Sequence, residues 1–434
     1  MRDPAPVPQG ADPSCQSMAC LDARELRCSA VPDNPKSKVL DGDNTSSWSA
    51  PATPLEDEDL LQEILLRLPP QASSLPRASL VCTRWRNILS DPKFLKRFRK
   101  HHQKPPLLGF FAGTPGCKHK FVPNLDKPNR VPAERFAVPN SSSLYDDWNF
   151  RGCRHGLAVL LNDRRRELVV WDPLTGQQHR VPFPPGLCTN ERVNAWHCDV
   201  TVLCANVEDG HVHGDCFSSP LKLVLMCGLY TQAFAWLYES TSGLWGNIVS
   251  TASKAAILCR RTNVVTGNAV YGLFCGGDCL VFDIERQTLG VMKKPTLPNV
   301  HTNNYQFFQL LRTDYGSGLG FAVLSKLSIH LWGRKMNSDG VAGWVLQPKI
   351  IQLEAIFPQI TPRNEKWVLF MGYDEDNNVI LLTTSIGKFM LQLESMQIKK
   401  ISETHENRYM VFYPYANFYI AGREVGWKWL DLKL

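Results

Sequence analysis

Apolar residues follow two different periods along this chain. Between residues 54 and 92 they recur at helical spacing, as in Leu60, Ile64 and Leu68, which places them on one face of an amphipathic helix. From Leu107 onward, short apolar runs alternate with turns rich in Gly, Asn, Asp and Pro, a pattern typical of strands. The chain is therefore predicted to be an α+β multidomain protein, in which a small helical module precedes a large all-β domain.

Three short helices are predicted between residues 54 and 92. Carboxylates at residues 57–59 begin the first helix, where they meet the positive end of the helix dipole, and Pro69-Pro70 ends it. A second helix can begin near Ser73, and a third spans roughly Thr83 to Leu89. Three helices in about 35 residues cannot bury enough apolar surface to be stable alone. A binding partner is therefore expected.

The same stretch resembles the F-box family. The family pattern is a leucine before an acidic stretch, a helix ending in Arg-Leu-Pro, and a Leu-x-Arg-x-x-x-Val-Cys-x-x-Trp run. Its counterparts in this chain are Leu55, residues 57–59, Arg67-Leu68-Pro69, Leu75, Arg77, Val81, Cys82 and Trp85. The chain departs from the pattern at Glu56, where the family usually has proline, so the entry loop is expected to dock differently.

The resemblance implies that the module binds the Skp adaptor of a cullin-RING ubiquitin ligase through apolar residues of its helices. The residues expected to make this contact are Leu55, Leu60, Ile64, Leu68, Pro69, Leu75, Leu80, Val81 and Trp85. Some of them are expected to serve the internal core instead, and the sequence does not divide the two groups. The competing interpretation is an ordinary helical hairpin packed on its own domain, which explains the periodicity but not the cluster at residues 81–86.

A sub-pattern recurs in the β region: an apolar run, a polar turn and another strand. Its copies are anchored near residues 171, 237, 282, 332 and 391, a spacing of roughly 45 to 65 residues that is close to a four-stranded propeller blade of about 50. Residues 107–113 could open a further blade that residues 410–420 would close. An irregular six-bladed β-propeller is predicted, with a large β-sandwich as the alternative.

The segment Val170-Trp171-Asp172-Pro173-Leu174-Thr175-Gly176 gives the β region a resemblance of its own. Together with the architecture, it is similar to plant F-box proteins whose C-terminal part is an F-box-associated or kelch-like β domain. The resemblance implies that residues 107–434 recognise a protein substrate. The sequence names no residue that contacts this substrate.

Composition predicts the state of the N-terminal residues, the cellular location and the state of the cysteines. Residues 1–50 are rich in Pro, Ser, Asp and Asn and are predicted to be a flexible tail. The chain has no run of 18 apolar residues and no apolar segment typical of a secretory signal. We therefore expect a soluble intracellular protein, cytoplasmic, nuclear or both, that does not bind membranes. Its fourteen cysteines are expected to be reduced thiols.

Residues 93–106 are predicted to be a basic linker helix followed by a Pro105-Pro106 hinge. Eight Lys or Arg and one Asp lie between Arg84 and Lys104, a net +7 that equals the formal charge of the whole chain. A basic helix at residues 93–104 can bind nucleic acid. The favoured interpretation is that its apolar stripe packs against the next domain while its basic face is solvated, or that its long side chains cover a domain junction, because no recognisable nucleic-acid-binding fold surrounds it.

Two other groups of residues invite a chemical interpretation. Potential metal ligands gather at Cys188, His197, Cys198, Cys204, His211, His213 and Cys216. They contain no Cys-x-x-Cys pair, and Val200, Val202 and Cys204 alternate as one strand face, which favours core thiols over a metal site. The acidic run at residues 374–378 lacks the Gly and Glu of a calcium loop and is predicted to be a solvated hairpin turn.

The sequence therefore predicts a non-catalytic substrate receptor of a Skp-cullin-F-box ubiquitin ligase. No set of acids, metal ligands or nucleophile motifs supports catalysis, so no catalytic residue, cofactor or metal is expected. The expected partners are the Skp-type adaptor, through it a cullin-RING complex, and an unknown protein substrate. A propeller-type enzyme and a nucleic-acid binder are the two alternatives.

Overall fold

The computed structural model describes most of the chain after residue 56. The predicted tail, Leu55 and Glu56 lie outside the described residues, which are 57–114, 119–137, 148–187, 198–206, 211–229, 231–253, 261–296, 305–313, 318–336, 338, 340–360, 368–403 and 410–419. Within them, no helix has the length and apolar character needed to cross a membrane.

The helical module forms as the pattern predicts, and a fourth helix joins it. Its helices are α1 (Glu58–Leu66), α2 (Ser74–Ala78), α3 (Thr83–Ser90) and α4 (Pro92–His102). The Asp57 carboxylate caps α1 by accepting hydrogen bonds from the backbone N–H groups of Asp59 (2.9 Å) and Leu60 (3.0 Å). Asp91 caps α4 in the same way, with Pro92 in the first turn.

The helix α4 shares a hydrophobic core with α1, α2 and α3. Phe94, Leu95 and Phe98, the apolar stripe of the basic segment, are buried in this core together with Leu61 and Leu65 of α1. The prediction that this stripe packs against the next domain is therefore wrong for most of its contacts, because the stripe packs chiefly inside the helical module. The contact of Phe98 with Phe418 is the part that reaches the next domain, so α4 belongs to the module and is more than a linker.

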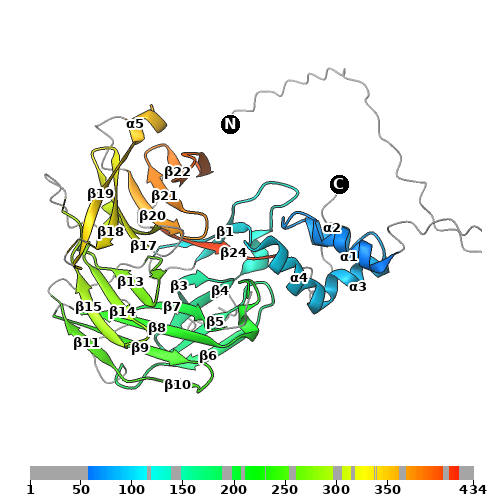
Figure 1. Cartoon of the computed structure of the whole chain (residues 1–434), viewed down its shortest axis with the longest axis horizontal. Coiled ribbons are helices and arrows are strands. Elements are labelled where there is room, and N and C mark those ends of the chain that lie inside the picture. The colour runs from blue at the N-terminus through cyan, green and yellow to red at the C-terminus, as the bar shows by residue number, and fades with distance from the viewer. Residues whose placement is uncertain are drawn as a thin grey trace, which may run out of the picture. The chain divides into compact units, whose positions relative to one another are not determined.

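The strands of the described residues form six antiparallel sheets (Figure 1). Five sheets take consecutive strands, which is the arrangement of propeller blades. The first two blades in chain order are β3 (Trp148–Arg154), β4 (Leu157–Asn162), β5 (Glu167–Trp171) and β6 (Gln178–Pro182), then β7 (Cys198–Cys204), β8 (Leu221–Gly228), β9 (Gln232–Glu239) and β10 (Leu244–Trp245), with β11 (Val249–Ala252) also pairing with β9.

The next three blades repeat the same order. Their strands are β12 (Val264–Thr266), β13 (Ala269–Leu273), β14 (Cys279–Asp283) and β15 (Thr288–Met292); β16 (Phe308–Thr313), β17 (Gly318–Ser325), β18 (Ser328–Met336) and β19 (Ala342–Gln352); and β20 (Leu369–Asp374), β21 (Val379–Thr384), β22 (Gly387–Gln392) and β23 (Ile398–Ser402). A short helix α5 (Leu353–Ile356) follows β19.

The sixth sheet joins distant parts of the chain and closes the ring. It contains β2 (Lys120–Pro123), β1 (Leu107–Gly113) and β24 (Val411–Ala416), in that order. The strands β1 and β24 run antiparallel, with Leu107 opposite Ala416 and Gly113 opposite Val411, and they lie side by side in Figure 1. The predicted closure of residues 107–113 by residues 410–420 is confirmed.

The five predicted anchors share one structural position. Trp171 in β5, Trp236 in β9, Phe282 in β14, Trp332 in β18 and Leu391 in β22 all lie in the third strand of their blade. The recurring sub-pattern was therefore the third strand and the turn into the fourth. The six-bladed propeller prediction is confirmed, and the β-sandwich alternative is wrong.

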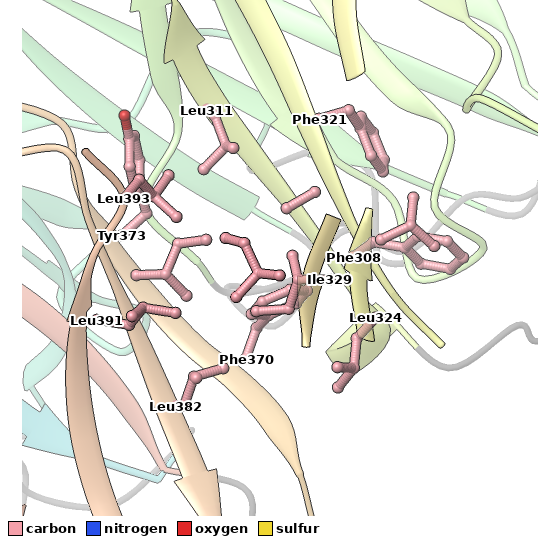
Figure 2. Packing of buried hydrophobic residues seen from close by; sticks show 14 of the residues in the cluster. Phe308, Leu311, Phe321, Leu324, Ile329, Phe370, Tyr373, Leu382, Leu391 and Leu393 are labelled. Atoms are coloured by element: carbon pink, nitrogen blue, oxygen red, sulfur yellow. The ribbon is translucent and has the colours of Figure 1, made fainter. Parts of the chain in front are cut away.

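Neighbouring blades pack through large apolar side chains. Between the fourth and fifth blades, Phe308, Phe321 and Ile329 belong to the same buried cluster as Phe370 and Leu391. Figure 2 shows side chains of β16 to β18 facing those of β20 to β22 across this interface. The second strands β4 and β21 are buried at every residue, because they are covered on both faces.

One cysteine pair departs from the expectation of reduced thiols. Cys198 and Cys227 are opposite each other in the β7–β8 register and form a disulfide, with their Cα atoms 4.1 Å apart. The prediction is therefore wrong for this pair. The sequence could not show it, because the two residues are brought together only by strand pairing 29 positions apart.

Candidate functional site

The helical module leaves four large apolar side chains exposed. Leu60 and Ile64 are 50% and 44% exposed, one helical turn apart on α1, and Leu80 and Val81 are 63% and 62% exposed between α2 and α3. The α1 residues Leu61 and Leu65, displaced by one position from the exposed pair, point into the core instead. The module therefore has one apolar face for its own core and further apolar residues in solvent.

The structure divides the remaining predicted residues between surface and core. Leu75 is 2% exposed and belongs to the core. Leu68 and Trp85 are half-buried and pack against that core, whereas Pro69 is exposed. Leu55 lies outside the described residues. Leu60, Ile64, Pro69, Leu80 and Val81 are thus the members of the predicted set that are available to a partner.

Polar side-chain contacts link α1 to α4. The Glu63 carboxylate accepts hydrogen bonds from Arg67 (2.8 Å) and Arg97 (2.6 Å), and Arg97 also donates to the side-chain oxygen of Gln62 (3.0 Å). The hydrogen bond from Arg67 is the main reason that the pKa of Glu63 is lowered, with the Coulombic attraction of both arginines adding to it. Arg97 of the basic segment is therefore engaged within the module.

The module is anchored to the propeller by hydrogen bonds near α2. The Ser73 hydroxyl donates to the side-chain oxygen of Asn129 (2.7 Å), and the Asn129 amide donates to the side-chain oxygen of Gln71 (3.0 Å). Ala72 between them is buried in a cluster that includes Phe111 and Trp171 of the propeller. The helices are therefore held in a defined position beside the sixth and first blades.

A second contact joins α4 to the loop that follows β7. Arg99 forms an ion pair with Asp215 (2.9 Å), and its side chain is 11% exposed. Val212 of the same loop and Phe418, which follows β24, pack against the core of the helical module. Arg97 and Arg99, two of the basic residues that a nucleic-acid site would use, are thus paired with carboxylates.

An ion-pair network of largely buried side chains joins three blades of the propeller. Arg154 of β3 forms an ion pair with Glu375, and Arg312 of β16 lies 3.8 Å from the same carboxylate. Burial raises the pKa of Glu375, and the two arginines oppose that shift. Small cavities beside this network are lined by Arg151, Thr201, Asn263, Tyr373 and Tyr415, among others.

The predicted hairpin at residues 374–378 forms between β20 and β21, but its acidic start is buried. Asp374 is 3% exposed, and its carboxylate accepts hydrogen bonds from the Asn377 amide (2.6 Å) and the backbone N–H of Asp376 (3.1 Å). Burial raises the pKa of Asp374 to about 6. The prediction of a fully solvated turn is therefore wrong for Asp374 and Glu375, because the neighbouring blades cover them.

Four of the seven potential metal ligands come together in the β7–β8 loop. The sulfur or ring nitrogen atoms of Cys204, His211, His213 and Cys216 all lie within 4.8 Å of one another. Cys198 is in the disulfide, and Cys188 and His197 lie outside the described residues. The sequence favoured core thiols because it has no Cys-x-x-Cys pair here, so it did not predict that these four residues come together. The His-x-His-x-x-Cys run at residues 211–216 is the signal that could have indicated it.

Family comparison assigns both folded regions. Residues 57–97 match the F-box domain. Residues 149–418 match the family described as "F-box protein AT5G49610-like, beta-propeller". The two matches together cover most of the described residues, and the second one alone covers more than half of the chain.

Similar curated proteins come from Arabidopsis thaliana. F-box protein At5g07610 is 23% identical over 57% of this chain and 59% of its own length. Putative F-box protein At3g19560 is 28% identical over 28% of this chain and 33% of its own, and putative F-box protein At3g16210 is 25% identical over 44% and 45%. The chain thus spans between a third and three fifths of the length of these relatives.

The exposed apolar residues of the helical module, the six-bladed ring and both family matches agree with one another. The chain belongs to the plant-type F-box proteins that carry an AT5G49610-like β-propeller after the F-box.

Proposed function

We propose that this protein is a substrate receptor of a Skp-cullin-F-box ubiquitin ligase. The observation that carries the proposal is the set of exposed apolar side chains at Leu60, Ile64, Leu80 and Val81, on a domain whose family implies an adaptor partner. Large apolar groups left in solvent by a module with its own core mark an interaction site. The Skp-type adaptor is the partner that fits them, and it would connect the chain to the cullin-RING complex.

In this proposal the receptor makes and breaks no bonds. The F-box holds the adaptor, and the propeller presents a protein substrate to the ubiquitin-charged conjugating enzyme. The gain in rate comes from proximity, because an encounter between separate proteins becomes an effectively intramolecular transfer. The hydrogen bonds of Asn129 and the ion pair of Arg99 support this role, since they hold the F-box in a defined position on the propeller.

The proposal is tested by changing Leu60 and Ile64 to alanine together. Both side chains are half in solvent, so their truncation should leave the core of the module intact. We expect adaptor binding to weaken by roughly 30-fold or more, corresponding to about 2 kcal/mol for a pair of central apolar contacts. Titration calorimetry or quantitative co-purification with a plant Skp protein measures the effect.

A matched control is available on the outer strand of the fourth blade. Val345 and Leu346 of β19 are 46% and 41% exposed, close to the values for Leu60 and Ile64. Val345→Ala with Leu346→Ala should leave adaptor binding unchanged. Equal loss in both double variants would indicate nonspecific apolar association, and undiminished binding by Leu60→Ala with Ile64→Ala would reject the proposed surface.

A further inference from the structure

The loop between β7 and β8 folds two thiols and two imidazoles into one cluster. Cys204 is the last residue of β7, Cys216 begins a short 3-10 helix at Cys216–Ser218, and His211 and His213 lie between them. All four ligand atoms lie within 4.8 Å of one another. Cys216 is buried and the other three residues are half-buried, so the cluster is shielded but lies near the surface.

The distances within the cluster match the edges of a tetrahedral metal site. The Cys204 sulfur lies 3.3 Å from His211 Nε2, the Cys216 sulfur 3.5 Å from the same nitrogen, and His213 Nδ1 3.3 Å from the Cys216 sulfur. Zinc bonds of about 2.3 Å to sulfur and about 2.0 Å to nitrogen at tetrahedral angles place sulfur and nitrogen about 3.6 Å apart. The four atoms therefore need only small adjustments to enclose such an ion.

The donor set narrows the choice of metal. Two cysteines with two histidines form a closed structural zinc site, whereas calcium and magnesium require oxygen ligands. All four positions would be filled by protein, so the site would be structural with no open position for catalysis.

Neighbouring side chains hold both histidine rings in place. The side-chain nitrogen of Asn206 lies 3.1 Å from His211 Nδ1, the ring nitrogen outside the cluster, and it also donates to the Ser219 hydroxyl (3.1 Å). The Nε2 atom of the same ring faces the sulfur atoms of Cys204 and Cys216. The His155 ring stacks on His213 at 3.4 Å with an interplanar angle of 4°.

We propose that Cys204, His211, His213 and Cys216 bind a structural zinc ion that fixes residues 211–216 against the F-box. The loop carries Val212 into the core of the helical module and pairs Asp215 with Arg99 of α4. Gly214, which has φ +128°, approaches the side chains of Asn417 and Phe418 so closely that an added Cβ would lie 3.0 Å from each. The ion would hold a short loop that contacts both folded regions at once.

Metal analysis of the full chain tests the proposal directly. After purification in a reducing buffer without an affinity tag, elemental mass spectrometry should find about one zinc per chain. Removing zinc with a chelator and adding cobalt should produce the intense thiolate-to-cobalt charge-transfer bands of a tetrahedral site. This measurement needs no variant and is therefore independent of any folding defect that a substitution causes.

Substitutions then assign the ligands. Cys204→Ser and His211→Asn should each lower the zinc content at least several-fold and abolish the cobalt bands. Cys275→Ser and His330→Asn change the same residue types outside the cluster and should retain zinc. Asp215→Ala, which removes the ion pair with Arg99 but no ligand, should also retain zinc.

A separate measurement tests whether zinc stabilises the contact between the F-box and the propeller. Chelation of wild-type protein should increase protease cleavage between α4 and β1, and restored zinc should reverse this. Three results would reject the zinc site. The reduced protein could contain no metal and give no cobalt bands, the variant Cys204→Ser could keep its zinc, or mass spectra could show a disulfide between Cys204 and Cys216. Unchanged cleavage after complete zinc removal would reject the role of zinc at this contact.

Discussion

The helical module and the propeller place their apolar side chains in opposite ways. Every residue of β4 and β21 in the propeller is buried, and the exposed large apolar residues of the described blades, such as Val345 and Leu346, lie toward their outer strands. In the module, Leu60 and Ile64 are exposed on α1 directly beside the core residues Leu61 and Leu65. One region buries nearly all of its large apolar side chains, and the other leaves several of them in solvent.

This difference shows where stability and recognition reside. The propeller gains its stability from blades that cover each other, so a change at the ring junction should affect the whole ring. The module gains part of its stability from the propeller, since Phe418 and Val212 enter its core, and its remaining apolar surface is the one that we propose binds the adaptor. Substitutions in the module can therefore change its stability and its partner binding separately.

The largest loss of stability is expected for Phe111→Ala. The Phe111 ring is fully buried in β1 and lies within 6.4 Å of five aromatic rings, those of Phe121, Phe136, Phe150, Trp171 and Tyr415. Its removal leaves a cavity where the sixth blade meets the first, which should lower the free energy of unfolding by about 3–5 kcal/mol. Chemical denaturation of the propeller measures this loss, and Phe111→Leu should cost less because it fills more of the cavity.

A smaller loss of stability is expected when a core residue of the helical module is truncated, and a still smaller one when an exposed residue is truncated. Leu75→Ala empties a position that is 2% exposed and should cost about 2–5 kcal/mol, whereas Leu60→Ala should cost less than about 1 kcal/mol. Hydrogen exchange of the α1–α4 amides distinguishes the two variants. Equal destabilisation would contradict the division of this region into a core face and a binding face.

The smallest effect concerns the buried carboxyl of Asp374. Its native pKa is raised to about 6, so it binds a proton more tightly in the folded state. Its contribution to stability is therefore complete below its unfolded pKa of about 4 and is lost as the pH rises through about 6, on the order of 1 kcal/mol for each unit of pKa difference. Asp374→Asn removes this titration, so the Tm of wild type relative to this variant should fall between pH 4 and pH 7.

The exposed neighbour Asp376 offers a second test of the same titration. Its charge helps to raise the pKa of Asp374, so Asp376→Asn should move the fall in Tm that depends on Asp374 to lower pH. A Tm difference between wild type and Asp374→Asn that stays constant from pH 4 to pH 7 would show that Asp374 does not titrate there.

The helical module was predictable because its signals are local. Helix caps, prolines and the apolar period each act within a few residues, as at Asp57 and Pro69-Pro70. The propeller was predictable for a related reason: each blade repeats one strand-turn-strand unit, and the apolar third strands mark the period. The closing sheet also followed, since residues 107–113 and 410–420 were strands without a blade of their own.

Features that depend on which strands become neighbours were not predictable. Asp374 is buried by blades that the sequence cannot place, and Cys198 meets Cys227 only through the β7–β8 register. Cys204 and Cys216 are twelve positions apart in the sequence and match no close cysteine pair, so the sequence did not indicate that their sulfur atoms lie near the ring nitrogen atoms of His211 and His213 in the fold. Which of the predicted adaptor-binding residues are exposed also depends on three-dimensional packing, because the apolar period does not distinguish the buried Leu75 from the exposed Leu80.

The pairing of β1 with β24 has a consequence for the order of folding. During synthesis, β1 emerges from the ribosome directly after the F-box, but the strand that covers its open edge is made roughly 300 residues later. At typical translation rates of about 5–20 residues per second, this edge waits for about 15–60 seconds. An unpaired apolar edge is a template for association with other chains. The nascent chain therefore has a period of greatest aggregation risk that ends only when residues 411–416 are released.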